Sequence, residues 1–202
     1  MKSTLDLARF NPRRLAYFEK ENYVAYYRRR WPRLLVVSVS MVKEAYQLSL
    51  PQAVYAAYLV ARAEMAAAPV PNNDIPRAEA CMERLFLFLK RRYSLPFDPA
   101  EAARQEVNWW VVHRRLFAQP QNQELVDALA AAMASFFGQP AQVFAASALE
   151  RARGILYSDQ WVRGGMDANS PLLRQEENAL CAGYSLLRGA LLAQAELHHG
   201  RA

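Results

Sequence analysis

The sequence predicts an all-α fold, a single-domain multi-helix bundle of about eight helices over residues 1–202. The chain is rich in alanine and leucine and has only 7 glycines, a composition that favours helices. Apolar residues recur at helical spacing, and no stretch alternates with period two for long enough to form a strand. With 202 residues, one domain buries roughly 70% of its unfolded surface, so the fold needs no disulfide or metal.

Prolines mark where the predicted helices begin. A proline suits the first helical turn, because the N–H that it lacks has no partner there. Asn11, Asp98 and Ser170 each precede a proline and predict N-caps, and Asp98 with Glu101 has the spacing of a capping box. The predicted helices cover residues 12–30, 32–48, 51–68, 75–93, 99–118, 122–137, 140–163 and 171–198.

The predicted helix at residues 51–68 carries no charge between Pro51 and Ala61. A helix that is apolar all round belongs inside a protein, so the pattern predicts one central buried helix. Tyr55 and Tyr58 would then place hydroxyl groups in the interior, with Arg62 one turn after Tyr58. These hydroxyls either pack as satisfied core groups or face a cavity.

The helix at residues 99–118 carries a strip of chemically active side chains. Glu106 and His113 are seven residues apart, which places them within about 20° of each other and about 10 Å apart along the axis. Trp109 and Trp110 lie between them. A carboxylate and an imidazole on an aromatic face need partners when buried. They either join a structural network with neighbouring helices or line a wet pocket as acid/base groups.

A second carboxylate lies on an apolar stripe of the last helix. Glu177 is in register with Leu180, Tyr184, Leu187 and Leu191, although it could equally be exposed in the first turn, where the helix dipole favours a negative charge. The leading hypothesis is therefore a pocket for a small, largely apolar molecule, with Glu106 and His113 as acid/base residues. The predicted ligand-binding residues are Trp109, Trp110, Tyr55, Tyr58, Arg62, Glu177 and Tyr184.

No metal site or cofactor is predicted. Histidine is the commonest transition-metal ligand, and His113 is the chain's one interior histidine. The sole Glu-x-x-His match, Glu196 to His199, lies at the C-terminal end. Phosphate-binding, dinucleotide-binding and nucleophile-elbow motifs are absent from the sequence. The size and layout are similar to haem-oxygenase-like and ferritin-like bundles, but their ligand motifs do not match, so no residue role transfers.

The sequence favours a cytoplasmic protein. Cys81 and Cys181 have no partner at metal-binding spacing, and two thiols inside helical patterns suit a reducing compartment. The first residues contain no apolar signal region. The longest uncharged run, residues 128–149, is interrupted by Gly138 and Pro140, which predicts two buried helices and no transmembrane segment.

The basic charge is concentrated near the N-terminus. Residues 1–50 hold 10 Lys+Arg and 4 Asp+Glu, which accounts for the whole net charge of +6. Within residues 13–33, the predicted partner-binding residues are Arg28, Arg29, Arg30, Trp31 and Arg33. The alternative hypothesis is an interaction module that docks an acidic protein partner through this face. Nucleic-acid binding comes third, because basic runs without a recognised motif are weak signals.

Overall fold

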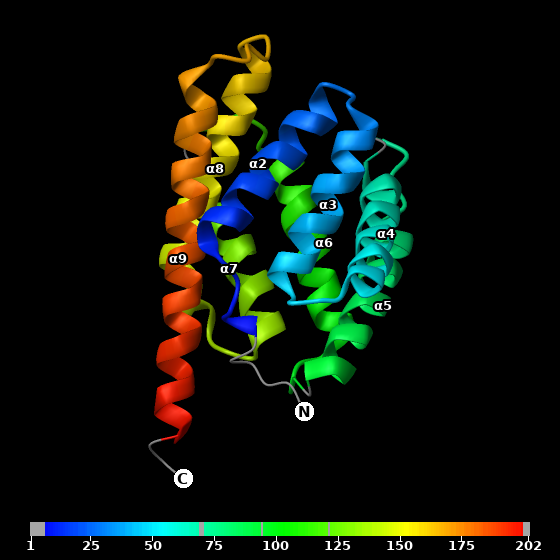
Figure 1. Cartoon of the computed structure of the whole chain (residues 1–202), viewed down its shortest axis with the longest axis vertical. Coiled ribbons are helices and arrows are strands. Elements are labelled where there is room, and N and C mark those ends of the chain that lie inside the picture. The colour runs from blue at the N-terminus through cyan, green and yellow to red at the C-terminus, as the bar shows by residue number, and fades with distance from the viewer. Residues whose placement is uncertain (1–6, 69–70, 94, 121, 200–202) are drawn as a thin grey trace.

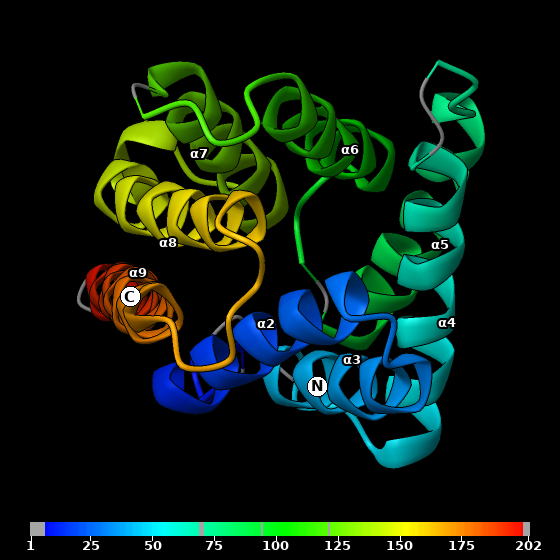
Figure 2. The same ribbon diagram turned by 90° about the horizontal axis from the view of Figure 1, so that it is seen from above.

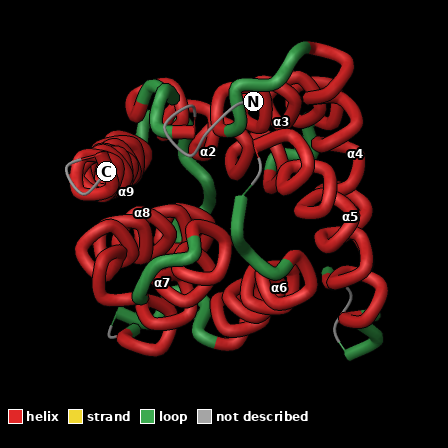
Figure 3. The backbone as a smooth tube through the Cα atoms, turned by 90° about the horizontal axis from the view of Figure 1, so that it is seen from below, coloured by secondary structure: helices red, strands yellow, loops and turns green. Residues whose placement is uncertain are grey.

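The computed structural model describes residues 7–68, 71–93, 95–120 and 122–199, and it confirms the all-α prediction. These ranges contain helices and loops without strands, as the tube in Figure 3 shows. No helix in them combines the length and low charge needed to cross a membrane. The helices are α2 (Pro12–Tyr27), α3 (Trp31–Ala45), α4 (Leu50–Ala67), α5 (Ile75–Tyr93), α6 (Pro99–Arg115), α7 (Gln123–Phe137), the 3-10 helix η1 (Ala141–Phe144), α8 (Ala145–Arg163) and α9 (Pro171–His199).

The helices form a closed circuit. Each packs on the next in chain order, from α2 to α9, and α2 also packs on α9. Figure 1 shows α2 beside α9 although they lie at opposite ends of the sequence, and Figure 2 shows the circuit along the long axis. Helices on opposite sides of the circuit make few close backbone approaches. Their inward side chains therefore meet across the middle.

Local signals set most of the helix boundaries. The side chain of Asn11 accepts hydrogen bonds from the backbone N–H groups of residues 13 and 14, and Asp98 caps α6 in the same way. The expected capping box of α6 is incomplete, since the Glu101 side chain accepts from Gln105 instead. The predicted helix 12–30 ends early, because Arg29 adopts a left-handed φ of 55° and redirects the chain into α3.

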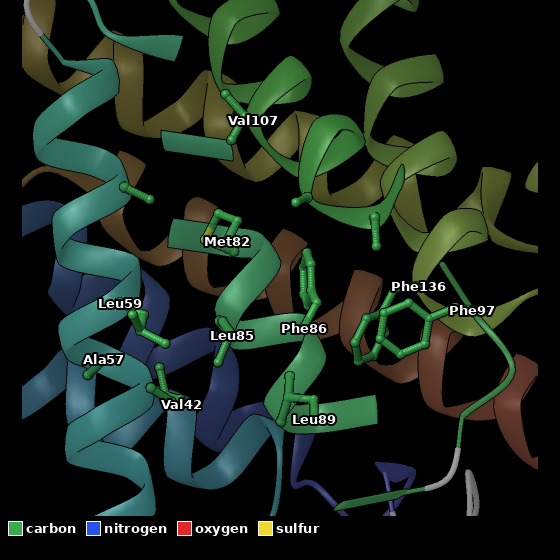
Figure 4. Packing of buried hydrophobic residues seen from close by; sticks show 14 of the residues in the cluster. Val42, Ala57, Leu59, Met82, Leu85, Phe86, Leu89, Phe97, Val107 and Phe136 are labelled. Carbon is green, nitrogen blue, oxygen red and sulfur yellow. The ribbon is translucent and has the colours of Figure 1, made fainter. Parts of the chain in front are cut away.

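Two clusters of buried apolar side chains hold the circuit together. The first joins α3, α4, α5 and α6, and Figure 4 shows it with the rings of Phe86, Phe97 and Phe136 side by side. The centroids of these rings are 5.0 to 6.0 Å apart. The second cluster joins α2, α7, α8 and α9. Trp109 packs against both clusters, so α6 links the two halves of the core.

The prediction that residues 51–68 form the central helix is wrong. One face of α4 is buried and consists of alanines with Leu59, which allow close packing on α5 and α3. The opposite face is exposed, including Tyr58 at 53% and Met65 at 69%. The absence of charge in residues 50–61 therefore does not indicate burial, because the uncharged side chains on the outer face of α4 are exposed.

Candidate functional site

Asp159 of α8 is the hub of a buried polar network around His113. Its side chain is 3% exposed and lies 3.0 and 3.1 Å from Nε2 of His113 through its two carboxylate oxygens. The Tyr23 hydroxyl donates to Oδ1 at 2.5 Å. The backbone N–H of Ala118 donates to Oδ2 at 2.9 Å, from a left-handed residue just after α6. His113 therefore faces inward and is held between α2 and α8.

A second polar network lies nearby, where α2, α8 and α9 meet. Arg151 Nη2 is 3.4 Å from Glu19 Oε1, and both side chains are at least four-fifths buried. The Tyr184 hydroxyl donates to the other oxygen of Glu19. The Arg151 guanidinium lies 5.9 Å from the Trp109 ring centroid and 5.4 Å from that of Tyr184. Each buried charge in this network has an opposite charge or an aromatic face beside it.

Glu106 faces this second network, although it shares a helical strip with His113. It is half-buried, and burial raises the pKa of its carboxyl above the ordinary value. The indole N–H groups of Trp109 and Trp110 and the charge of Arg151 act in the opposite direction, while Glu19 adds to the increase in pKa. No salt bridge joins Glu106 to a described residue.

Glu64 of α4 adds a carboxyl that the sequence analysis did not select. Desolvation by the surrounding protein raises the pKa of Glu64 to about 7; the charge of Arg114 opposes this increase, and that of Glu106 adds to it. The residue nevertheless remains exposed, and its side chain makes no hydrogen bond or salt bridge with a described residue. Arg114 lies near Glu64, because its Nη1 donates at 2.5 Å to the carbonyl of Ala67, which follows Glu64 by three residues on α4.

On α9 the exposed alternative for Glu177 holds, and its neighbour Glu176 is the buried acid. Glu176 is 1% exposed, and its Oε2 has no hydrogen-bond partner in the described part of the chain. Burial raises its pKa to about 8, against the effect of the Ser158 hydroxyl. Glu177 instead binds Lys20 Nζ at 2.8 Å, with 39% of its side chain exposed. Glu176 precedes buried Leu180 by four residues and so takes the buried position on the stripe.

Of the other predicted ligand-binding residues, those on α6 and α9 face the interior, and those on α4 do not. Tyr184 and Trp110 are buried, and Trp109 is partly buried. Tyr55 is 46% exposed and Tyr58 53%, because both belong to the outer face of α4. Arg62 Nη1 donates to the Tyr58 hydroxyl at 2.9 Å on that surface. Their expected place inside the bundle is therefore wrong.

The predicted partner-binding residues are divided by the fold. Arg28 turns toward the α8–α9 connection, where its Nη2 donates to the Met166 carbonyl at 2.5 Å. Arg33 donates to the side chains of Glu21 and Tyr17 within the N-terminal helices. The remaining residues, Arg29, Arg30 and Trp31, are exposed, with Trp31 at 56%.

Two recesses on the described surface lie away from the inner polar groups. One, of about 420 Å³, lies between α5 and α6 and includes Arg104 and Asn108. The other, of about 370 Å³, lies between α2 and α3 and includes Phe18 and Lys43. Neither is lined by Glu106 or His113. Within the described residues, no three His, Cys, Asp or Glu side chains are placed to hold a metal ion.

The sequence contains weak signals for the residues that were missed. Glu64 follows Ala57 by seven residues and Val60 by four, which places it beside the inner stripe of its helix. Asp159 is an acid within the largely apolar segment of residues 155–162. The chain matches no protein-family model, no curated protein and no solved structure, so the site rests on its own chemistry.

Proposed function

We propose that the protein binds a small molecule inside the helical circuit and uses Glu64 and Glu106 as an acid/base pair. One observation carries the proposal. The charge of Glu106 on α6 raises the pKa of Glu64 on α4, and neither carboxyl forms a salt bridge within the described chain. Carboxyls with strongly perturbed pKa values cluster at functional sites.

The pair has the properties that proton transfer needs. A carboxyl with a pKa of about 7, as for Glu64, exchanges protons readily at neutral pH. Two neighbouring carboxyls that disfavour each other's ionisation tend to hold one proton between them, which provides an acid and a base together. Arg114 and Arg151 flank the pair, and the indoles of α6 form an apolar wall beside it. These surroundings suit a largely apolar molecule with one polar or ionisable end.

His113 supports the proposed site because it lies on α6, the same helix as Glu106. Asp159 fixes Nε2 and so fixes the rotation of the helix face that presents Glu106. We therefore assign His113 a positioning role first and an acid/base role second. The half-buried, free thiols of Cys81 and Cys181 support a cytoplasmic setting for this function.

The test compares single carboxyl replacements. Native mass spectrometry of the purified protein should reveal a co-purified small molecule, and Glu64→Gln or Glu106→Gln should reduce its occupancy at least tenfold. Glu196→Gln, which changes an exposed carboxyl on α9, should leave occupancy unchanged. In parallel, ¹³C NMR of the side-chain carboxyls should show Glu64 titrating near neutral pH and responding to Glu106→Gln. Full occupancy in both variants, or ordinary and independent titration of both acids, would refute the proposal.

Docking of an acidic protein remains the second candidate. The exposure of Arg29, Arg30 and Trp31 favours it, since cationic and aromatic side chains suit an acidic surface. Because Arg28 and Arg33 already have partners within the chain, this face is smaller than predicted. The interior site therefore has the stronger support.

A further inference from the structure

The α3–α4 hairpin exposes an unusual amount of apolar surface. Eight of its large apolar side chains are between 46% and 69% exposed: Trp31, Leu35, Val36, Leu50, Val54, Tyr55, Tyr58 and Met65. On α4, Leu50, Val54, Tyr58, Ala61 and Met65 follow one another at intervals of three or four residues. They therefore form one stripe along the outer face of the helix.

The exposed area is large for a monomer. At roughly 100 Å² for each half-exposed side chain, the eight residues present roughly 800 Å². Soluble monomers seldom expose contiguous apolar patches beyond a few hundred Å². One partner of a standard stable interface contributes about 800 Å². The hairpin therefore exposes about as much apolar area as one side of a stable dimer.

The charge pattern identifies the kind of partner. Residues 50–61 contain no charged residue, and the first charge after them, Arg62, is hydrogen-bonded to Tyr58 of the same helix. A strongly acidic or basic partner would lose hydration of its charges against this stripe without gaining opposite charges. A second copy of the same chain brings an equally uncharged stripe, and a two-fold axis makes such a surface complementary to itself.

We propose that two copies of the chain form a symmetric dimer through the outer faces of their α4 helices, packed antiparallel. A two-fold axis between Ala57 and Tyr58 sets Leu50 opposite Met65 of the second copy. The same register sets Val54 opposite the small side chain of Ala61 of the second copy, so apolar residues meet along the whole stripe. The stripe from Leu50 to Met65 is about 22 Å long, which suits helices crossing at a shallow angle of about 20°.

This register also keeps like charges apart. Arg62 lies opposite position 53 of the second copy. The Cα atoms of the two Arg62 residues are therefore about 13 Å apart along the helix axis. That distance exceeds the screening length of about 8 Å at physiological salt. Leu35 and Val36 on the neighbouring helix α3 would extend the contact beyond α4.

Sedimentation velocity from 1 to 100 µM tests the proposal. The wild-type protein should sediment as a dimer of the 23.0 kDa chain. Val54→Arg and Tyr58→Arg should each weaken dimerisation at least 100-fold, because each places two arginines in a desolvated contact. Leu149→Arg is the matched control, since Leu149 is 48% exposed on α8 and lies outside the stripe. Circular dichroism should show native helix content for all three variants.

A disulfide experiment tests the register. Tyr58→Cys, next to the axis, should form an intermolecular disulfide under mild oxidation, and Leu149→Cys should not. A monomeric wild-type protein at 100 µM overturns the proposal, and so does a dimer that both arginine variants leave intact. Sedimentation of monomeric protein with anionic lipid vesicles would overturn it too, by assigning the stripe to a membrane surface.

Discussion

Replacing Asp159 with alanine is expected to lower the free energy of unfolding by about 3–5 kcal/mol, as for other broken buried charge networks. The side chain is 3% exposed and accepts from Tyr23, His113 and the backbone of Ala118. Without it, at least the tyrosine hydroxyl and the N–H of Ala118 lose their acceptor inside the protein. Each buried donor without a partner costs about 1–3 kcal/mol. Their sum agrees with the range for the whole network.

Urea unfolding followed by far-UV circular dichroism measures this loss. For a chain of this length, each kcal/mol lowers Tm by about 2–4 °C, so Asp159→Ala should melt roughly 6–20 °C below the wild type. Asp159→Asn keeps one acceptor oxygen and should lose less. Asp127→Ala is the control, because this exposed aspartate accepts only from Gln123 one turn before it and should change stability by about 0.5 kcal/mol or less. If Asp159→Ala is as stable as Asp127→Ala, the hub interpretation is wrong.

Three further predictions concern the interior around α9. Arg151→Met should destabilise the protein by about 3–5 kcal/mol by leaving Glu19 unpaired, and adding Glu19→Gln should recover part of the loss in the same urea assay. The pKa of Glu176 is raised to about 8, so its contribution to stability is complete below its unfolded pKa and is lost as pH rises from about 4.5 to 8. Glu176→Gln should flatten that dependence by up to about 1.4 kcal/mol per pH unit, and an unchanged slope between pH 5 and 8 would contradict the assignment. Gly183→Ala should lower the free energy of unfolding by about 1–3 kcal/mol, because the added Cβ would lie 2.8 Å from the Arg151 side chain. Gly189→Ala, where the added Cβ meets open space, should raise it by up to about 1 kcal/mol. Equal melting temperatures for the two variants would refute this prediction.

The sequence predicted the helices well because their limits depend on nearby residues. Asn11 and Asp98 cap helices through their own side chains, and Gly138 ends α7 in a left-handed conformation. These effects act over one turn, so a single sequence reveals them. Helix ends that depend on tertiary turns, such as the one at Arg29, were placed too late.

The position of a helix in the bundle depends on longer-range packing. An uncharged segment such as residues 50–61 of α4 has the same sequence pattern whether it is covered by its own chain, by a second molecule or by nothing. Its alanines pack against α5 and its larger side chains face outward, a choice that depends on the shape of α5. The prediction of a central helix failed at this step.

The sequence predicted only those parts of the candidate site that lie on one helix. The strip on α6 was recognised because helical geometry alone brings Glu106, Trp109 and His113 to one side. Their partners Asp159 and Arg151 come from α8, and Glu64 comes from α4. No spacing rule connects these segments, so only the folded arrangement brings them together.

The closure between α2 and α9 has a consequence for how the protein is made. Lys20 and Glu177, Glu19 and Tyr184, and Ala8 and Arg188 are joined over sequence separations of 157, 165 and 180 residues. During synthesis the ribosome releases α2 long before α9, so Glu19 and Lys20 of α2 lack their partners on α9 until that helix has been made. Assembly of the inner charges is then a late event, limited by closing one very long loop. Chaperones have the greatest opportunity to act during that interval.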